Sequence, residues 1–202
     1  MKNWILFFMC VTCLRQPVIS QEGQAGTSVE KICSFVRWYG ENWEKLSKLE
    51  SNIIDAGALK LKENEESAPY SVNFDEVEKY INELTNTGFF SEDYLTAQRQ
   101  QFGEIASNFK KNPQNEGPPE GFQYDRFFLT QEDFLQDIVN IDGITLSESK
   151  LTENATTVYM HFPVCDQTYC YRLSIKEGKW QIDSISDIIC ADIPHTQKPK
   201  KQ

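Results

Sequence analysis

The chain has 202 residues, of which 40% are hydrophobic and 25% charged, and its formal net charge at pH 7 is −10. This length and apolar content predict one domain with its own hydrophobic core. The acidic excess argues against nucleic acid and anionic membranes as partners, because binding to phosphates requires clustered Lys and Arg. The basic cluster in residues 198–201 belongs to a predicted solvated tail.

Residues 1–20 have the features of a secretory signal peptide. Lys2 provides a basic start, and residues 4–14 form an apolar run that is too short to span a bilayer. Small or β-branched residues occupy the positions that signal peptidase reads before Gln21. We therefore predict a secreted or periplasmic protein.

The mature chain is predicted to be a single domain over residues 21–202, with a core over residues 27–189 and a disordered tail over 194–202. Its net charge is −12, because the leader contains two basic residues and no acidic one. Cys10 and Cys13 fit a lipid attachment signal poorly, so lipidation is the less favoured alternative. No later run is long and apolar enough for a transmembrane helix, so we predict no membrane span.

Three N-terminal helices are predicted from capping residues and apolar spacing. Thr27 and Glu30 form a capping box, and Asn73 and Ser91 are N-caps of a second and a third helix that Gly88 separates. The first helix carries one apolar stripe at three- and four-residue spacing. The stripe consists of Val29, Ile32, Cys33, Val36, Tyr39, Trp43, Leu46, Leu49 and Ile53.

Strands fill the second half of the chain. A Pro/Gly-rich loop at 112–121 is followed by a predicted short strand at 122–129 and by a helical turn that Thr130 and Asp133 cap. Alternating apolar residues then predict four strands, at 144–152, 156–164, 169–176 and 179–186. Helices followed by strands predict an α+β fold, with the N-terminal helices packed on an antiparallel C-terminal sheet.

The register of the sheet can be tested, because opposed residues of an antiparallel pair share a face. Placing Cys165 opposite Cys170 collects the apolar residues on one face and moves His161 to the other, beside Ser174. The predicted inner face consists of Val158, Met160, Phe162, Val164, Tyr171, Leu173, Ile175, Trp180 and Ile182.

The last hairpin follows from a two-residue turn after Lys176. This turn pairs Leu173 with Ile182 on the inner face, and it places Arg172 opposite Asp183 on the outer face.

The four cysteines of the mature chain predict disulfide bonds, because an even count behind a signal peptide is typical of oxidised proteins. Three pairings are open in principle. The register favours Cys165 with Cys170, which leaves Cys33 with Cys190. A zinc site would bring C-x-x-C spacing or nearby His ligands, and neither is present. We expect no metal and no cofactor.

Catalytic candidates are few. His161 is predicted on the polar face, away from the covered interior, and no serine or cysteine nucleophile motif is present. Asp125, Asp133 and Asp137 are the remaining acid or base candidates, and they would need burial to raise their pKa values. Most aspartates in such positions cap turns.

Aromatic side chains are candidates for lining a pocket where the helices meet the sheet. Buried Tyr and Trp side chains need hydrogen-bond partners, so some of them are expected at a wet pocket, and ordinary core packing is the alternative. The predicted pocket residues are Trp38, Tyr39, Tyr94, Asp125, Asp133, Tyr171 and Trp180.

Four features occur in order along the chain: a long first helix with a central tyrosine (FVRWYGENW), two further helices, the QED segment at 131–133 and the EGKWQI hairpin. In this order the chain resembles the nuclear transport factor 2-like, or cystatin-like, superfamily. The resemblance covers residues 27–189, and in particular the chain is similar to secreted bacterial domains of unknown function. It implies a sheet curved into a cone, with a pocket at the mouth. Some members are isomerases or dehydratases that use a pocket Asp or Asp/His pair, and many only bind.

The favoured hypothesis is a non-enzymatic binding module for a small molecule, peptide or protein, which uses the cone pocket or the outer sheet face. One alternative is an isomerase or dehydratase-like enzyme that uses a pocket aspartate. Another is an inhibitor or immunity protein against a secreted enzyme. Members of the superfamily often dimerise through the outer sheet face, which implies contacts by Tyr159, His161 and Arg172 in a homodimer.

Overall fold

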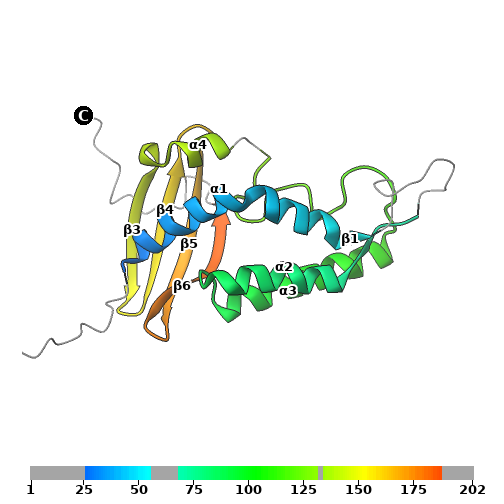
Figure 1. The fold of residues 1–202 in the computed structure, drawn as a ribbon, viewed down its shortest axis with the longest axis horizontal. Coiled ribbons are helices and arrows are strands. Elements are labelled where there is room, and N and C mark those ends of the chain that lie inside the picture. Colours follow the sequence, from blue (N-terminus) through cyan, green and yellow to red (C-terminus); the bar gives the residue numbers. More distant parts are fainter. Residues whose placement is uncertain (1–25, 56–67, 132–133, 188–202) are drawn as a thin grey trace, which may run out of the picture.

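The computed structural model describes residues 26–55, 68–131 and 134–187. Helices occupy the first part of this chain and a four-stranded antiparallel sheet the last, so the predicted α+β class is confirmed. The sheet lies at one end of the molecule and a helical hairpin at the other, and one long helix joins them (Figure 1). The predicted leader, the tail, Asp133 and Cys190 lie outside the described residues.

Helix α1 (Ser28–Ile53) is the element that joins the two ends. It begins at the predicted capping box, in which Thr27 accepts from the backbone N–H of Glu30 and Glu30 accepts from the backbone N–H of Thr27. Its 26 residues reach about 39 Å. Its first half crosses one face of the sheet, and its second half lies along the helical hairpin (Figure 1).

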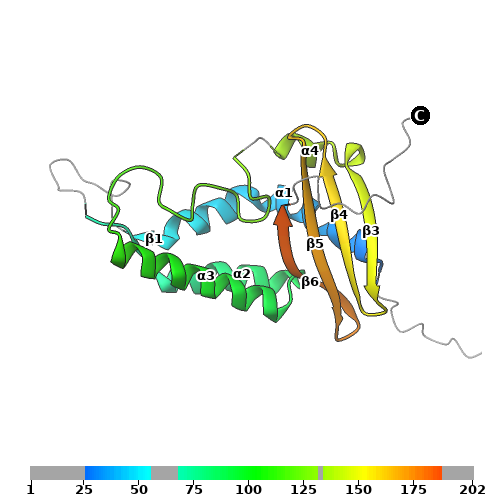
Figure 2. The same cartoon turned by 180° about the vertical axis from the view of Figure 1, so that it is seen from behind.

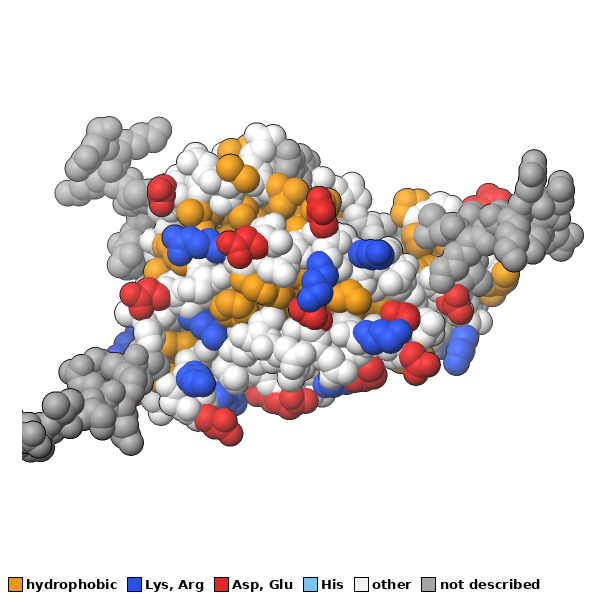
Figure 3. Space-filling model, in the orientation of Figure 1, with side chains coloured by type: hydrophobic (Ala, Val, Ile, Leu, Met, Phe, Trp, Pro, Cys, Tyr) orange, Lys and Arg blue, Asp and Glu red, His pale blue; other side chains and the backbone are white. Residues whose placement is uncertain are grey.

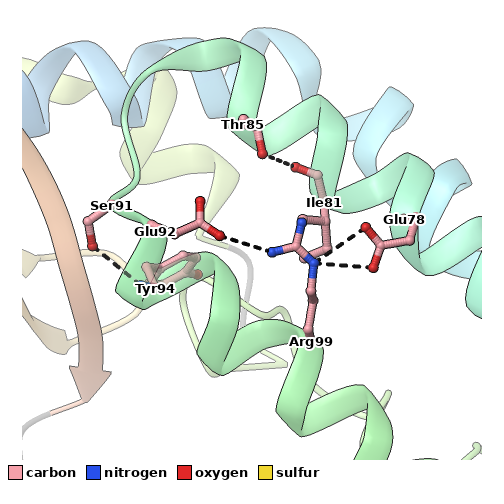
Figure 4. Close-up of polar contacts among 7 residues, drawn as sticks. All are labelled: Glu78, Ile81, Thr85, Ser91, Glu92, Tyr94 and Arg99. Carbon is pink, nitrogen blue, oxygen red and sulfur yellow. Dashed lines mark hydrogen bonds and ion pairs between the residues drawn. The ribbon is translucent and has the colours of Figure 1, made fainter.

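The helical hairpin consists of α2 (Phe74–Thr87) and α3 (Glu92–Lys111), preceded by the short pair β1 (Ile54–Asp55) and β2 (Ser71–Val72). Asn73 and Ser91 cap the two helices as predicted. Arg99 of α3 forms an ion pair with Glu78 of α2, which ties the two helices together on their exposed side, and a second ion pair with Glu92 within α3 (Figure 4).

The turn between α2 and α3 attaches the hairpin to the sheet. Gly88 ends α2 with φ of +64°, a left-handed conformation that favours glycine. Phe90 then forms a parallel bridge with Ile182 of the last strand. Ser91 donates to the Ile182 carbonyl at 3.0 Å, and Ile182 donates to the Phe89 carbonyl at 2.8 Å. The hairpin thus covers one edge of the sheet.

The segment between α3 and the sheet differs from the prediction. Residues 122–129 form turns and not a strand, because Asp125 accepts hydrogen bonds from two following backbone N–H groups. Helix α4 (Leu135–Val139) begins after Phe134 without a side-chain cap, so the predicted cap at Thr130 is wrong. A short 3₁₀ helix, η2 (Ile141–Gly143), leads into the sheet.

The sheet has the strand order β3-β4-β5-β6 and lacks the predicted cone shape, because it is neither closed nor strongly curled. Helix α1 covers one face, and no described helix covers the opposite face (Figure 2). The strands are β3 (Thr145–Thr152), β4 (Ala155–Phe162), β5 (Gln167–Lys176) and β6 (Lys179–Asp187).

The register between β4 and β5 is displaced from the prediction. Cys170 lies opposite Tyr159 and not Cys165, a difference of six positions along the chain. Because six is even, the same residues face inward as in the predicted register. The four-residue turn after Phe162 absorbs Cys165, and the carboxylate of Asp137 accepts from the N–H groups of Val164 and Cys165 at 2.9 and 3.0 Å.

The inner face is therefore largely as predicted. Val158, Met160, Phe162, Tyr171, Leu173 and Ile182 are fully buried. The prediction that Val164 faces inward is wrong, because Val164 lies in the turn and is 55% exposed. Ile175 and Trp180 are half-buried. His161 lies on the outer face as predicted, but its partner is Thr168 and not Ser174.

The last hairpin has the predicted pairing of Leu173 with Ile182. A register shift next to Arg172 places that residue opposite Ser184, so the predicted pairing of Arg172 with Asp183 is wrong.

The displaced register also corrects the predicted disulfide. Cys165 and Cys170 are both unbonded, because one lies in the turn and the other on the outer face of β5. Cys33 is bonded to no cysteine in the described part of the chain. Its pairing with Cys190 stays a prediction, since Cys190 lies outside the described residues.

Phe35 of α1 is the centre of the hydrophobic core. Its ring lies within 6.3 Å, centroid to centroid, of six other aromatic rings. They come from α1, from the α2–α3 turn, from the segment between α3 and α4, which we call the loop, and from β5. These rings belong to Trp38, Tyr39, Phe89, Phe90, Phe127 and Tyr171. This cluster is where the helical end and the sheet end of the molecule share one core.

We expect Phe35→Ala to lower the free energy of unfolding by about 3 to 5 kcal/mol, because it removes a fully buried ring from the shared core. Phe74→Ala is the matched control, since Phe74 is 51% exposed, and we expect a loss below about 1 kcal/mol. Urea unfolding of both variants measures these values. Equal losses would contradict the central place of Phe35.

Candidate functional site

A cavity of about 510 Å³ lies between the second half of α1 and the loop that follows α3. We call it the α1 cavity. Its aromatic walls are Trp43, Phe122, Tyr124 and Phe134. Hydroxyl and amide groups come from Ser47, Ser51, Gln123, Thr130 and Gln131, and the two carboxylates are Glu50 and Asp125. The cavity is therefore mostly apolar with a few polar groups, which is typical of ligand sites.

Asp125 organises the loop side of the cavity. One carboxylate oxygen accepts from the backbone N–H groups of Phe127 and Phe128 at 2.9 and 2.8 Å, and the other accepts from the hydroxyl of Tyr39. Burial raises the pKa of Asp125 above its ordinary value near 3.8, while the hydrogen bonds from Tyr39 and the backbone oppose this rise. The carboxylate thus holds the turn and links it to α1.

Tyr39 is the partner of Asp125 on α1. Its side chain is buried among the rings of Phe127, Phe128 and Phe134. Burial raises the pKa of Tyr39 far above its ordinary value, and the nearby charge of Asp125 raises it further. The hydroxyl therefore stays protonated and acts as a hydrogen-bond donor.

Glu50 and Arg126 form a second link between α1 and the loop. The Nε atom of Arg126 lies 2.6 Å from a carboxylate oxygen of Glu50, and the Arg126 side chain is only 4% exposed. Burial raises the pKa of Glu50 above its ordinary value, and the charge of Arg126 opposes this rise. A buried ion pair of this kind requires further hydrogen bonds to offset desolvation.

The remaining contacts of Arg126 supply part of that compensation, because its buried Nε lies close to Glu50 but forms no hydrogen bond with the described residues. Its guanidinium donates to the Gly121 carbonyl at 3.1 Å and to the Gln101 side chain at 3.3 Å. It also lies over the rings of Phe102 and Phe122, at 4.2 and 4.8 Å from their centroids. Arg126 therefore joins α3, the loop and α1 behind the cavity.

Of the other predicted aspartates, Asp137 lies apart from the cavity. It is 1% exposed and holds the turn between β4 and β5 through the two backbone N–H groups described above. Asp133 lies outside the described residues. Asp125 is thus the predicted aspartate that the structure places at the cavity.

The predicted aromatic residues are dispersed and do not line one pocket. Trp38 packs against Phe89, Tyr94 stacks on Phe90, and Tyr171 is fully buried in the core. Trp180 lies at a different cavity of about 230 Å³, near the start of α1. Tyr39 reaches the α1 cavity only through its hydrogen bond to Asp125.

The sequence-based prediction missed Glu50 and Arg126. Glu50 continues the spacing of the apolar stripe, because it lies seven residues after Trp43 and four after Leu46. A carboxylate at a core position of a helix is the signal that could have identified it. Arg126 had no such signal, because its partners come from three separate segments: α1, α3 and the loop after α3.

A further cavity of about 540 Å³ lies beside β2 and the ends of α2 and α3. Its walls include Tyr70, Phe74, Phe109 and Lys110, and they contain no carboxylate. Polar groups that converge on an apolar pocket are what orient a ligand. The α1 cavity therefore is the stronger candidate site.

Within residues 26–55, 68–131 and 134–187, no group of three or more His, Cys, Asp or Glu side chains is arranged to hold a metal ion. None of the helices in these same ranges combines the length and apolar character that crossing a membrane requires. On the face in Figure 3, acidic and basic side chains are interspersed, with apolar side chains between them.

Comparison with known proteins gives no relative for this chain: no protein-family model, no curated protein and no solved structure matches it. The resemblance to the nuclear transport factor 2-like superfamily therefore stays a prediction. Arguments about function depend on the geometry of the site.

We expect the pH dependence of stability to reveal the burial of Asp125. Its pKa is higher in the folded chain than its ordinary value near 3.8, so folding favours the protonated form. The stability that this group contributes is therefore full below about pH 4 and is lost as pH rises through the folded pKa. Asp125→Asn removes this titration.

The stability of the native chain relative to Asp125→Asn should thus fall as pH rises from about 3 to about 7. Urea unfolding of both proteins over that range measures the difference. A relative stability that increases with pH would mean that the hydrogen bonds to the carboxylate outweigh its burial.

Proposed function

We propose that the mature chain is a secreted or periplasmic binding protein without catalytic activity, and that it holds a small organic molecule in the α1 cavity. The observation that carries this proposal is the cavity itself, which combines aromatic walls with converging polar groups. Its volume of about 510 Å³ falls within the range of small-molecule sites.

The sequence supports the compartment. A basic start, a short apolar run and a cleavage position precede the mature chain. A secreted or periplasmic protein is exposed to small molecules that come from outside the cell.

The hydrogen bonds of the aspartates support binding over catalysis. Both oxygens of Asp125 and both oxygens of Asp137 already accept from donors of the fold. A general base must reach the substrate proton, and these hydrogen bonds fix both carboxylates toward the backbone turns and Tyr39. These carboxylates are better suited to holding backbone turns.

An isomerase or dehydratase-like enzyme is the second candidate, and one observation favours it. Asp125 has a raised pKa, contacts Tyr39 and lies at a cavity with room for a substrate. Groups with raised pKa values in clefts are candidates for proton transfer.

Protein or peptide binding would use a different surface. The outer face of the sheet is free of described helices (Figure 2), and Tyr159, His161 and Arg172 project from it. A homodimer, or an inhibitory contact with a secreted enzyme, would use this face. Neither involves the α1 cavity.

Ser51→Trp tests the proposal by filling the α1 cavity from its wall. We expect it to weaken the binding of cavity ligands by about tenfold or more, because the indole occupies their space. Glu44→Trp is the matched control, since Glu44 is exposed on the same helix and is not part of the cavity wall.

Saturation-transfer NMR with a library of small aromatic fragments supplies the measurement. The native chain and Glu44→Trp should bind the same fragments, and Ser51→Trp should lose them. If the native chain binds none, or if Ser51→Trp retains them all, the proposal is wrong.

A further inference from the structure

We propose that the ligand of the α1 cavity carries a positively charged ammonium group on an apolar body. This inference rests on the proposed function and names the chemical class of its ligand. The first argument is the charge of the cavity wall. The wall contains the carboxylates of Glu50 and Asp125, and none of its residues within the described ranges is Lys, Arg or His.

The nearest buried cation is unavailable to an anionic ligand. Arg126 is 4% exposed, and its guanidinium is directed to Glu50, Gln101 and the Gly121 carbonyl. The rings of Phe102 and Phe122 cover it further. A ligand carboxylate or phosphate in the cavity would therefore meet acidic groups without a free cationic partner.

The aromatic walls favour a cation as well. Trp43, Phe122, Tyr124 and Phe134 surround the same space as the two carboxylates. The faces of aromatic rings attract ammonium groups, and tryptophan does so most strongly. Aromatic rings beside carboxylates therefore provide both parts of an ammonium site, while the apolar wall receives the rest of the ligand.

The electrostatics of the surrounding interior point the same way. At the cavity, Asp125 accepts a hydrogen bond from the uncharged hydroxyl of Tyr39, and Glu50 pairs with Arg126. One guanidinium thus faces two carboxylates. A bound ammonium group would supply the missing positive charge, and the net charge of the whole chain, −10, would attract it from a distance.

Three probes of similar size test the inference: 2-phenylethylamine, which is protonated at pH 7, 2-phenylethanol and phenylacetate. Titration calorimetry with the native chain should give an affinity for the amine about tenfold or more above that for the alcohol, and no measurable binding of phenylacetate. An alcohol or a carboxylate that binds as tightly as the amine would overturn the inference.

The variants Ser51→Lys and Asn52→Lys locate the effect. Both add one positive charge to exposed positions of α1, but only Ser51 belongs to the cavity wall. Ser51→Lys should lower the affinity for the amine by about tenfold, whereas Asn52→Lys should change that affinity by less than about twofold. Equal losses in the two variants would place the amine outside the cavity and overturn the inference.

The outcome separates this inference from the proposed function. If 2-phenylethanol binds as tightly as the amine and Ser51→Trp abolishes the binding of both, the cavity binds ligands but does not select for a positive charge. If none of the three probes binds, the ammonium class is wrong. The fragment library then decides on its own whether the cavity binds small molecules at all.

Discussion

The α1 cavity depends on the buried ion pair between Glu50 and Arg126. The chain between α3 and the sheet has little regular structure, so its position must come from specific side chains. Arg126 supplies this by joining the loop to α1 and α3, and Asp125 adds a second link to Tyr39 of α1. These two links, together with the packing of Phe127 on Phe35 and Tyr39, hold the aromatic wall of the loop opposite α1.

Burying the carboxylates of Glu50 and Asp125 lowers the stability of the fold. Burial raises the pKa values of both Glu50 and Asp125, which means that their charged forms are incompletely compensated. Apolar residues of similar size at such positions are often as stable as a buried ion pair, or more stable. The carboxylates therefore suggest a requirement other than stability, and an ammonium ligand at the cavity would provide one.

Features fixed by neighbours in the sequence were predictable. The capping box at Thr27, the caps at Asn73 and Ser91, and the glycine that ends α2 depend on residues within four positions of one another. The last hairpin was also predictable, because a two-residue turn sets its register.

Features fixed by distant residues were not predictable. Asp137 holds the turn between β4 and β5 from 27 positions away, which displaced the register and separated Cys165 from Cys170. Asp125 was predicted as a candidate because it lies between the Pro/Gly-rich loop and the sheet, but its partner Tyr39 lies 86 positions away. Arg126 had no sequence signal, because tertiary packing alone brings its partners together.

A double-mutant cycle on Glu50 and Arg126 tests the central claim most directly. Glu50→Met and Arg126→Met each leave one buried charge without its partner, whereas the double variant removes both charges. Urea unfolding of the four proteins gives the coupling free energy. The account predicts that the double variant is more stable than the sum of the single losses by about 1 to 3 kcal/mol. Losses that add to within about 0.5 kcal/mol would contradict it, because Arg126 would then not hold the loop to α1.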